Sequence, residues 1–384
     1  MKQSDLFYDV DALADVRAVH AEAESSRGAQ ALDGALARGC WIYGAGGYGR
    51  LVRRLLEARG RRVHGFVDRR AGVPALVASL GLPIVLPDEL TPECARGATL
   101  IVALHNFATD QTPVVAWARA LGFDPILIPA DLPDLLGPEA ESYWLTRRSH
   151  VVDHLERIGE VADMLADDRS RETLFALAHF RAGGGIDIHP PADITDQYFP
   201  RDLPPLADGA RIVDGGAFTG DIWDGIARAG TAVDSWYAFE PDPANFAALV
   251  ATARRAPARR TALFPCGLGD RMHQLRFASG QASSRAVAAG EGDTVVQIVA
   301  LDEVLSGAAP TLIKLDVEGA EREALAGMRA TLMRDRPRLA VAIYHLPQDL
   351  WEIPLMVRDL MPEAKLYVRQ HGFNGFDTVL YAVD

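Results

Sequence analysis

The sequence predicts an α/β protein with two units of parallel-sheet type, a smaller one followed by a larger one. Short apolar runs alternate with helix-like segments in two separate stretches of the chain. Each stretch opens with a glycine-rich turn between a strand and a helix. The length of 384 residues exceeds what one ordinary hydrophobic core organises, so more than one domain is expected.

Composition and charge narrow the class of protein. Hydrophobic residues make up 49% of the chain, charged residues 24%, and the formal net charge is −13. Such an acidic surface argues against nucleic acid or an anionic membrane as the main partner. The chain lacks the run of about 20 apolar residues that a membrane span requires. Three widely spaced cysteines and an N-terminus without a signal-peptide pattern predict a cytoplasmic protein.

Four segments follow from the order of these patterns. We expect an N-terminal helical segment at 1–37 and a small Rossmann-like domain at 38–135. A helical linker and lid is expected at 136–205, and the larger α/β domain at 206–384. Within the linker, Tyr198 and Phe199 are expected to cover a bound cofactor or to anchor the linker to the core.

The small domain has a Gly-x-Gly-x-x-Gly turn after its first strand. Its residues are Gly44, Gly46, Gly47 and Gly49, and Asp68 ends the next strand at the distance typical of dinucleotide sites. The domain resembles the small Rossmann-like domains that precede sugar acyltransferases and accompany some sugar methyltransferases. Three interpretations stay open: a nucleotide or nucleotide-sugar site, an NAD site, or a scaffold without a ligand.

The second glycine-rich turn follows the apolar run 211–214 and precedes a helix expected at 221–229. Its glycines allow the backbone to approach a ligand, and the start of the helix offers unpaired N–H groups. The next strand, 235–239, ends in Glu240, a carboxylate placed to accept both hydroxyls of a ribose. A tight strand-to-helix turn with a solvent-facing glutamate is the structural alternative.

The rest of the chain continues the alternation. The expected elements are a helix at 243–255, a strand at 261–265, an irregular segment at 271–297, a strand at 311–316, a helix at 321–334, a strand at 339–345, a helix at 351–360, and final strands at 365–369 and 378–383. The last two strands are joined by a loop containing Gly and Asn and are expected to be antiparallel. A mostly parallel sheet that ends in such a pair is the outline of class I S-adenosylmethionine-dependent methyltransferases.

Five sequence pieces together carry a resemblance to one family. They are Val-Asp-Gly-Gly-Ala-Phe-Thr-Gly-Asp at 213–221, Phe-Glu-Pro-Asp-Pro-Ala-Asn-Phe at 239–246, Gly-Leu-Gly-Asp at 267–270, Ile-Lys-Leu-Asp-Val-Glu-Gly-Ala-Glu at 313–321 and Phe-Asp-Thr-Val-Leu-Tyr-Ala-Val at 376–383. In this order and at these spacings, residues 150–384 resemble the FkbM family of S-adenosylmethionine-dependent methyltransferases. The resemblance covers about 60% of the chain and omits the N-terminal domain.

The resemblance implies a cofactor site for S-adenosyl-L-methionine. Its expected members are Asp214, Gly215, Gly216, Thr219, Gly220, Asp221, Glu240, Pro241, Gly267, Leu268 and Asp316. The glycines are expected to meet the methionine moiety, Glu240 the ribose, and Gly267 with Leu268 the adenine. Thr219 and Asp221 stand where a helix begins and are expected to combine this role with helix capping.

Four polar residues are the candidates for catalysis: Lys314, Asp316, Glu318 and His345. Asp316 falls at the carboxyl end of its strand, where open α/β sheets bind ligands, and His345 ends the neighbouring strand. An imidazole with a pKa near ~6.5 could accept the proton of a hydroxyl during methyl transfer, while a core histidine is the structural alternative. Asp316 and Glu318 could instead hold Mg²⁺, and Glu321 is expected to cap its helix.

The predicted function is O-methylation of a hydroxyl on a sugar, glycan precursor or secondary metabolite, with the segment 279–292 as a candidate acceptor contact. Two alternatives remain: a nucleotide-sugar-binding regulatory module without turnover, and an NAD-dependent oxidoreductase that uses the first glycine turn. The expected partner is a small-molecule or glycan acceptor. The sequence leaves the acceptor, the metal dependence and the formation of a homo-oligomer open.

Overall fold

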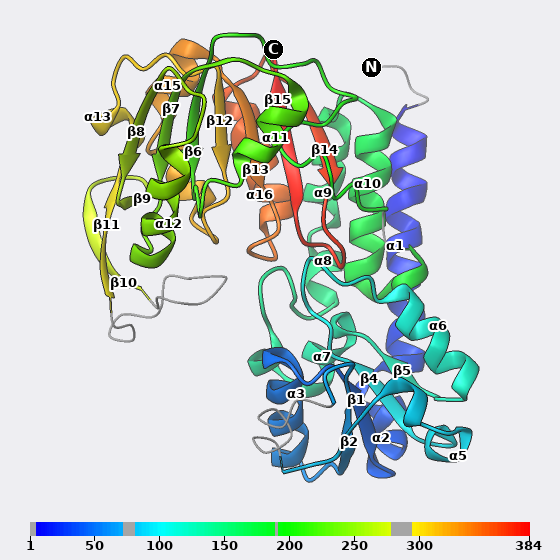
Figure 1. Ribbon diagram of the computed structural model, residues 1–384. Helices are drawn as coiled ribbons and strands as arrows, with labels where there is room; N and C mark the ends of the chain where they lie inside the picture. The colour runs from blue at the N-terminus through cyan, green and yellow to red at the C-terminus, as the bar shows by residue number, and fades with distance from the viewer. Residues whose placement is uncertain (1–4, 72–80, 189–190, 278–293) are drawn as a thin grey trace. The chain divides into compact units, whose positions relative to one another are not determined.

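The computed structural model describes residues 5–71, 81–188, 191–277 and 294–384 (Figure 1). The chain forms two compact units. Unit 1 comprises Met1–Asp163, Glu172–Ala192 and Gly372–Phe376, and unit 2 comprises Met164–Arg171, Asp193–His371 and Asp377–Asp384. The segment expected as a linker and lid is thus divided between the two units. The segment 279–292, a candidate acceptor contact, lies outside the described residues.

Unit 1 contains a five-stranded parallel sheet with the strand order β3-β2-β1-β4-β5. The strands are β1 (Cys40–Tyr43), β2 (Val63–Val67), β3 (Ile84–Val85), β4 (Thr99–Val102) and β5 (Ile126–Leu127). All four residues of β4 are buried, as expected for a parallel strand covered on both faces. This sheet confirms the predicted small Rossmann-like fold.

Helices follow and precede these strands. They are α1 (Asp5–Arg27), α2 (Ala29–Ala37), α3 (Gly47–Ala58), α5 (Pro92–Ala95), α6 (Thr112–Leu121), α7 (Leu132–Leu136), α8 (Ser149–Asp153), α9 (Leu155–Met164) and α10 (Asp168–His179). Short helical turns are η1 (Pro87–Glu89), η2 (Pro129–Asp131), η3 (Pro138–Ala140), η4 (Phe180–Gly184) and η5 (Ile186–Ile188). Among the described residues, no helix is long and apolar enough to span a membrane.

Unit 2 is built on a seven-stranded sheet with the order β14-β15-β13-β12-β6-β7-β8. The strands are β6 (Ala210–Gly215), β7 (Val233–Phe239), β8 (Arg260–Phe264), β12 (Leu312–Leu315), β13 (Arg338–Ala342), β14 (Lys365–Gln370) and β15 (Thr378–Val383). Only β15 runs antiparallel to its neighbours, β13 and β14. The predicted mostly parallel sheet that ends in an antiparallel pair is confirmed.

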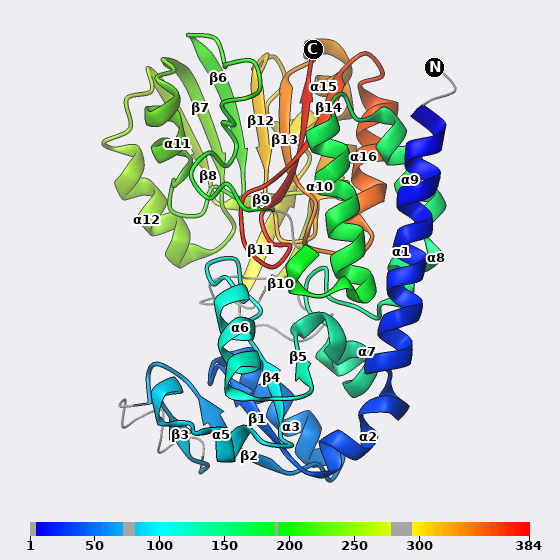
Figure 2. The ribbon, with the colours of Figure 1, turned by 90° about the vertical axis from the view of Figure 1, so that its right-hand side faces the viewer.

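Helices cover both faces of this sheet. In Figure 2, α11 (Ile222–Ala229) and α12 (Pro243–Ala253) lie on one side, and α15 (Arg329–Asp335) and α16 (Asp349–Leu360) lie on the other. The core between one face and its helices includes Ile212, Trp236 and Leu249, all fully buried. Such alternation of strand and helix brings the carboxyl ends of β6, β7 and β12 to one edge.

Two sequence expectations are wrong in this unit. The segment expected to be irregular contains β10 (His273–Phe277) and β11 (Thr294–Val299), which form a three-stranded sheet with β9 (Cys266–Leu268). The single helix expected at 321–334 is two helices, α14 (Glu321–Ala326) and α15. They part at Gly327, where a Cβ would lie 1.9 Å from the carbonyl oxygen of Gly269, so close backbone packing interrupts the helix. The helix α13 (Leu301–Val304) precedes β12.

Candidate active site

The loop after β6 is packed against the turn after β12. Gly216 has a φ of 71°, and a Cβ at this position would lie 1.8 Å from the carbonyl oxygen of Asp316. The amide of Asp316 donates a hydrogen bond to the carbonyl of Gly215 at 3.1 Å. Because Gly216 has no Cβ, the two backbones can approach closely, and the loop lies beside Asp316.

Glu240 holds the same loop from the end of β7. Its carboxylate accepts hydrogen bonds from the backbone amides of Phe218 and Asp242, each at 2.8 Å. Burial raises the pKa of Glu240, although these two amides counteract that rise. The carboxylate thus already accepts two backbone hydrogen bonds, and the expected contact with a ribose would use its remaining lone pairs.

Lys314 and Asp214 form a buried ion pair behind the loop. The Lys314 Nζ lies 3.2 Å from Asp214 Oδ1 and also donates to the carbonyl of Gly216. The indole Nε1 of Trp236 donates to Asp214 Oδ2 at 3.2 Å. Burial alone would lower the pKa of Lys314, but the carboxylates of Asp214, Asp316 and Asp221 raise it above its usual range. Lys314 is therefore a charged structural partner of the loop rather than a proton acceptor.

The other expected cofactor residues lie along the same loop and beside it. Gly220 has a φ of 88°, and a Cβ there would lie 2.8 Å from Thr252 Cγ2 on α12. Thr219 is half-buried, whereas Asp221 is exposed at the start of α11 and makes no capping hydrogen bond. The interpretation of Asp221 as a capping residue is therefore wrong.

The expected adenine contacts lie on β9 and next to the loop. Leu268 Cδ1 would be 2.9 Å from a Cβ on Gly215, and Pro241 Cγ would be 3.8 Å from a Cβ on Gly267. Leu268 is buried. The structure thus gathers Gly215, Pro241, Gly267 and Leu268 in one region of unit 2, as the sequence order of the motifs predicts.

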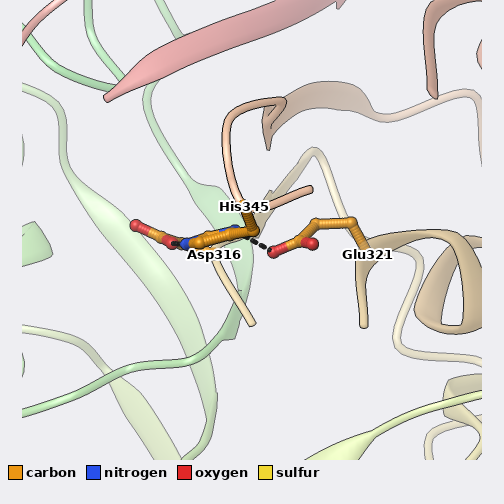
Figure 3. Close-up of side chains that lie close together, drawn as sticks. All are labelled: Asp316, Glu321 and His345. Carbon is orange, nitrogen blue, oxygen red and sulfur yellow. Dashed lines mark ion pairs between the residues drawn. The ribbon is translucent and has the colours of Figure 1, made fainter. Parts of the chain in front are cut away.

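A chain of ion pairs links Asp316, His345 and Glu321 (Figure 3). His345 Nε2 lies 3.2 Å from Asp316 Oδ1, and its Nδ1 lies 2.8 Å from Glu321 Oε1. Glu321 also accepts hydrogen bonds from the amides of Val317 and Gly319, so it holds the turn before α14. The expected helix-capping residue therefore binds both the turn and the imidazole.

The charges of these three ion-paired side chains change the role expected of His345. Burial alone would lower the pKa of His345, but the carboxylates of Glu321 and Asp316 raise it well above its usual range. Burial likewise opposes ionisation of Asp316, but His345, Lys314 and Tyr198 hold the pKa of Asp316 below its usual range. The raised pKa favours the imidazolium form of His345, which stabilises the ionised Asp316 and is less suited to accept a proton, the role expected from the sequence.

Two further residues belong to this cluster: Tyr198, which the sequence suggested only as a cover over the cofactor or an anchor of the linker, and Asp377, which was not among the expected site residues. Tyr198 donates its hydroxyl to Asp316 Oδ2 at 2.6 Å. Burial and the charge of Asp316 raise the pKa of Asp377 to about 7, and a hydrogen bond from Tyr344 counteracts that rise. Asp377 directly precedes the fully buried strand β15, so an acidic residue at the start of a buried strand was the signal that could have found it.

The cluster has features of a cation site but does not favour Mg²⁺. One ligand atom each from Asp316, Glu321 and His345 lie within 4.8 Å of one another. Glu318, a member of the expected Mg²⁺ pair, has a φ of 58° and an Oε2 at 3.7 Å from His345 Nε2. Magnesium prefers an octahedral shell of oxygens and water, whereas here the imidazole nitrogens of His345 face the carboxylates, and its raised pKa favours the charged form. The expected Mg²⁺ gains no support.

The buried carboxyl group of Asp349 should make the free energy of unfolding depend on pH. Burial and the charge of Glu321 raise the pKa of Asp349 from its usual 3.8 to about 7, and its Oδ2 accepts from the Leu346 amide at 2.7 Å. Between these pH values the folded protein keeps a proton that the unfolded chain has lost, so stability falls as pH rises toward 7. We expect Asp349→Asn to remove this fall and to gain on the order of 2 kcal/mol over the wild type between pH 4 and 8.

Urea unfolding of both proteins across this pH range measures the effect. The asparagine keeps an acceptor for the Leu346 amide, so the two proteins should differ little at pH 4. If the free energies of unfolding of wild type and Asp349→Asn differed by the same amount at every pH in this range, the raised pKa of Asp349 would be contradicted.

The first glycine motif, in unit 1, is packed closely and is bound by residues of the same unit. Gly44 has a φ of 102°, and a Cβ on Gly49 would lie 1.9 Å from the carbonyl oxygen of Gly44. Gly46 and Gly47 face open space. Asp68 accepts from the Ala45 amide at 2.8 Å and pairs with Arg70, and these contacts outweigh burial and lower its pKa to about 2. A ribose at Asp68 would have to compete with Arg70.

Comparisons with known proteins agree with this fold. Residues 214–374 match the model of the methyltransferase FkbM domain. The crystal structure of methyltransferase FkbM from Methylobacillus flagellatus KT is similar, with a TM-score of 0.77 and 23% identity over 98% of this chain and 99% of that chain. Aeropyrum pernix fibrillarin in complex with natively bound S-adenosyl-L-methionine reaches a TM-score of only 0.28, with 15% identity over 47% of this chain and 70% of that chain. No curated protein sequence matches the chain.

The fold and the matched residues define a methyltransferase with a Rossmann-like α/β fold. More particularly, residues 214–374 match the methyltransferase FkbM domain, and the chain has the fold of a solved FkbM methyltransferase. Neither the regulatory module without turnover nor the NAD-dependent oxidoreductase is favoured by these similarities.

Proposed function

We propose that the protein uses S-adenosyl-L-methionine to methylate a hydroxyl group of a sugar, glycan precursor or secondary metabolite. The observation that carries this proposal is the loop after β6, which Glu240 and Lys314 hold in place beside Asp316. A glycine loop, a ribose acceptor and a carboxylate at the carboxyl edge of one parallel sheet are the parts such a reaction needs.

The residues present fit this cofactor. The close approach at Gly216 brings the loop backbone to Asp316, and a Cβ there would fill that approach. The backbone of Gly215, Gly216 and Gly220 would hold the methionine moiety, Glu240 the ribose, and Pro241, Gly267 and Leu268 the adenine. The cofactor supplies a methyl group already activated by a sulfonium. The protein therefore has to align the acceptor and accept its proton.

Asp316 is the proposed proton acceptor. The acceptor oxygen forms a bond to the methyl carbon while the carbon–sulfur bond breaks, and the bonding pair stays on sulfur. The proton of the hydroxyl becomes strongly acidic as its oxygen acquires positive charge, so even a weakly basic carboxylate can take it. The Nε2 of His345 lies 3.2 Å from Asp316 Oδ1 and stabilises the ionised carboxylate, the form that can accept the proton.

Calorimetric titration of the full chain with S-adenosylhomocysteine tests cofactor use. We expect binding by the wild type and a loss of affinity of about 10- to 100-fold in Glu240→Ala. The alanine removes the proposed ribose acceptor and leaves the amides of Phe218 and Asp242 without their partner.

Glu363→Ala removes an exposed glutamate of the same unit and serves as the matched control, with unchanged affinity expected. Absence of binding by the wild type, or equal binding by wild type and Glu240→Ala, would contradict the proposal. Transfer of labelled methyl groups to neutral sugars, lost in Asp316→Ala, would then identify the acceptor class.

A further inference from the structure

Tyr198 lies in the segment before β6, outside residues 214–374 of the family match. Its side chain is nevertheless part of the cluster around Asp316. The phenol donates to Asp316 Oδ2 at 2.6 Å, and Gln197 Nε2 donates to the phenol oxygen at 3.1 Å. Tyr198 is 5% exposed. A residue from before the matched domain thus contacts the proposed proton acceptor directly.

The backbone of Tyr198 is held in an unfavourable conformation. Its φ is 68°, a left-handed value that side chains with a Cβ rarely adopt. Its amide donates to the hydroxyl of Tyr381 at 3.0 Å, and that hydroxyl lies 2.8 Å from His371 Nε2. Residues held in such conformations by their surroundings are concentrated at functional sites. The hydrogen bond to Tyr381 on β15 therefore holds the backbone of Tyr198 in this conformation.

Tyr198 and His345 approach Asp316 through different oxygens. His345 Nε2 lies 3.2 Å from Oδ1, while the phenol binds Oδ2. Two donors on two oxygens determine the plane of a carboxylate. The Asp316 side chain is 19% exposed, so it remains open to a ligand. The Tyr198 ring also lies under Lys314, with Nζ 5.3 Å from its centroid.

We propose that Tyr198 is a positioning residue, which turns the Asp316 carboxylate toward the sulfonium and its methyl group. The inference rests on the proposed use of S-adenosyl-L-methionine. A carboxylate held there favours the positively charged methyl donor relative to the neutral product, S-adenosylhomocysteine. The Tyr198 hydroxyl acts on this preference through Asp316.

A double-mutant cycle on cofactor affinity tests the proposal without a known acceptor. Calorimetry gives dissociation constants for S-adenosyl-L-methionine and S-adenosylhomocysteine in wild type, Tyr198→Phe, Asp316→Asn and the double variant. We expect Tyr198→Phe to weaken binding of the methyl donor about fivefold, with the product bound as in the wild type. Asp316→Asn should reduce the same preference further, and Tyr198→Phe should add nothing in its background.

Tyr237→Phe removes a hydroxyl on β7 and should leave both affinities unchanged. Equal weakening of both ligands by Tyr198→Phe would mean a general packing role and would overturn the proposal. Additive effects of the two substitutions on the donor preference would also overturn it. Wild-type protein that binds neither ligand would refute the proposed function itself, an outcome distinct from binding without the expected preference.

Discussion

Lys314→Ala is expected to lower the free energy of unfolding by about 3–5 kcal/mol, because it leaves Asp214 as a buried charge without its cationic partner. Both side chains are almost inaccessible to solvent, at 3% and 0% exposure. The substitution also removes the donor to the carbonyl of Gly216, so the loop loses a support at the same time. Scanning calorimetry should show a fall of about 10 °C in the unfolding temperature of unit 2.

A matched control variant and a compensating double variant complete this experiment. Lys365 is exposed at the start of β14, so Lys365→Ala should leave the unfolding temperature almost unchanged. Replacing both partners, as Lys314→Met with Asp214→Asn, removes the uncompensated charge and should restore part of the stability. A single Lys314→Ala variant as stable as the wild type would contradict the buried ion pair.

Gly216→Ala is expected to weaken binding of S-adenosylhomocysteine more than about 100-fold, because the loop must move to accommodate the new Cβ. That Cβ would lie 1.8 Å from the carbonyl oxygen of Asp316, which belongs to backbone and cannot rotate away. The loop and the turn after β12 would separate, and with them the two halves of the proposed site. Calorimetric titration measures the loss.

Gly230 provides a closely matched control. Its φ of 69° resembles the 71° of Gly216, but a Cβ there would meet nothing within 4 Å. Gly230→Ala should therefore cost about 1 kcal/mol of stability through its left-handed backbone alone and leave ligand affinity unchanged. Similar losses of affinity in both variants would show that backbone strain, rather than the contact with Asp316, governs the loop.

The fold could be predicted because local patterns repeat along the chain. The two glycine turns, the alternation of apolar strands with helices and the final antiparallel pair are all short-range features. Parallel strands end at the same edge of a sheet, so Asp214, Glu240 and Asp316 were expected near one another and lie there. The strands β10 and β11 were not predicted, because the segment 271–297 was expected to be irregular and shows no alternation of strand and helix.

What the sequence determined by itself was the fold and the resemblance of residues 150–384 to one methyltransferase family. The protonation state of His345 depends on Glu321, which sits on another element and binds its second nitrogen. The contact of Tyr198 with Asp316 joins residues 118 positions apart. Charge and orientation at this site arise from contacts between residues far apart in sequence, which no local pattern encodes, and so only the tertiary structure decided them.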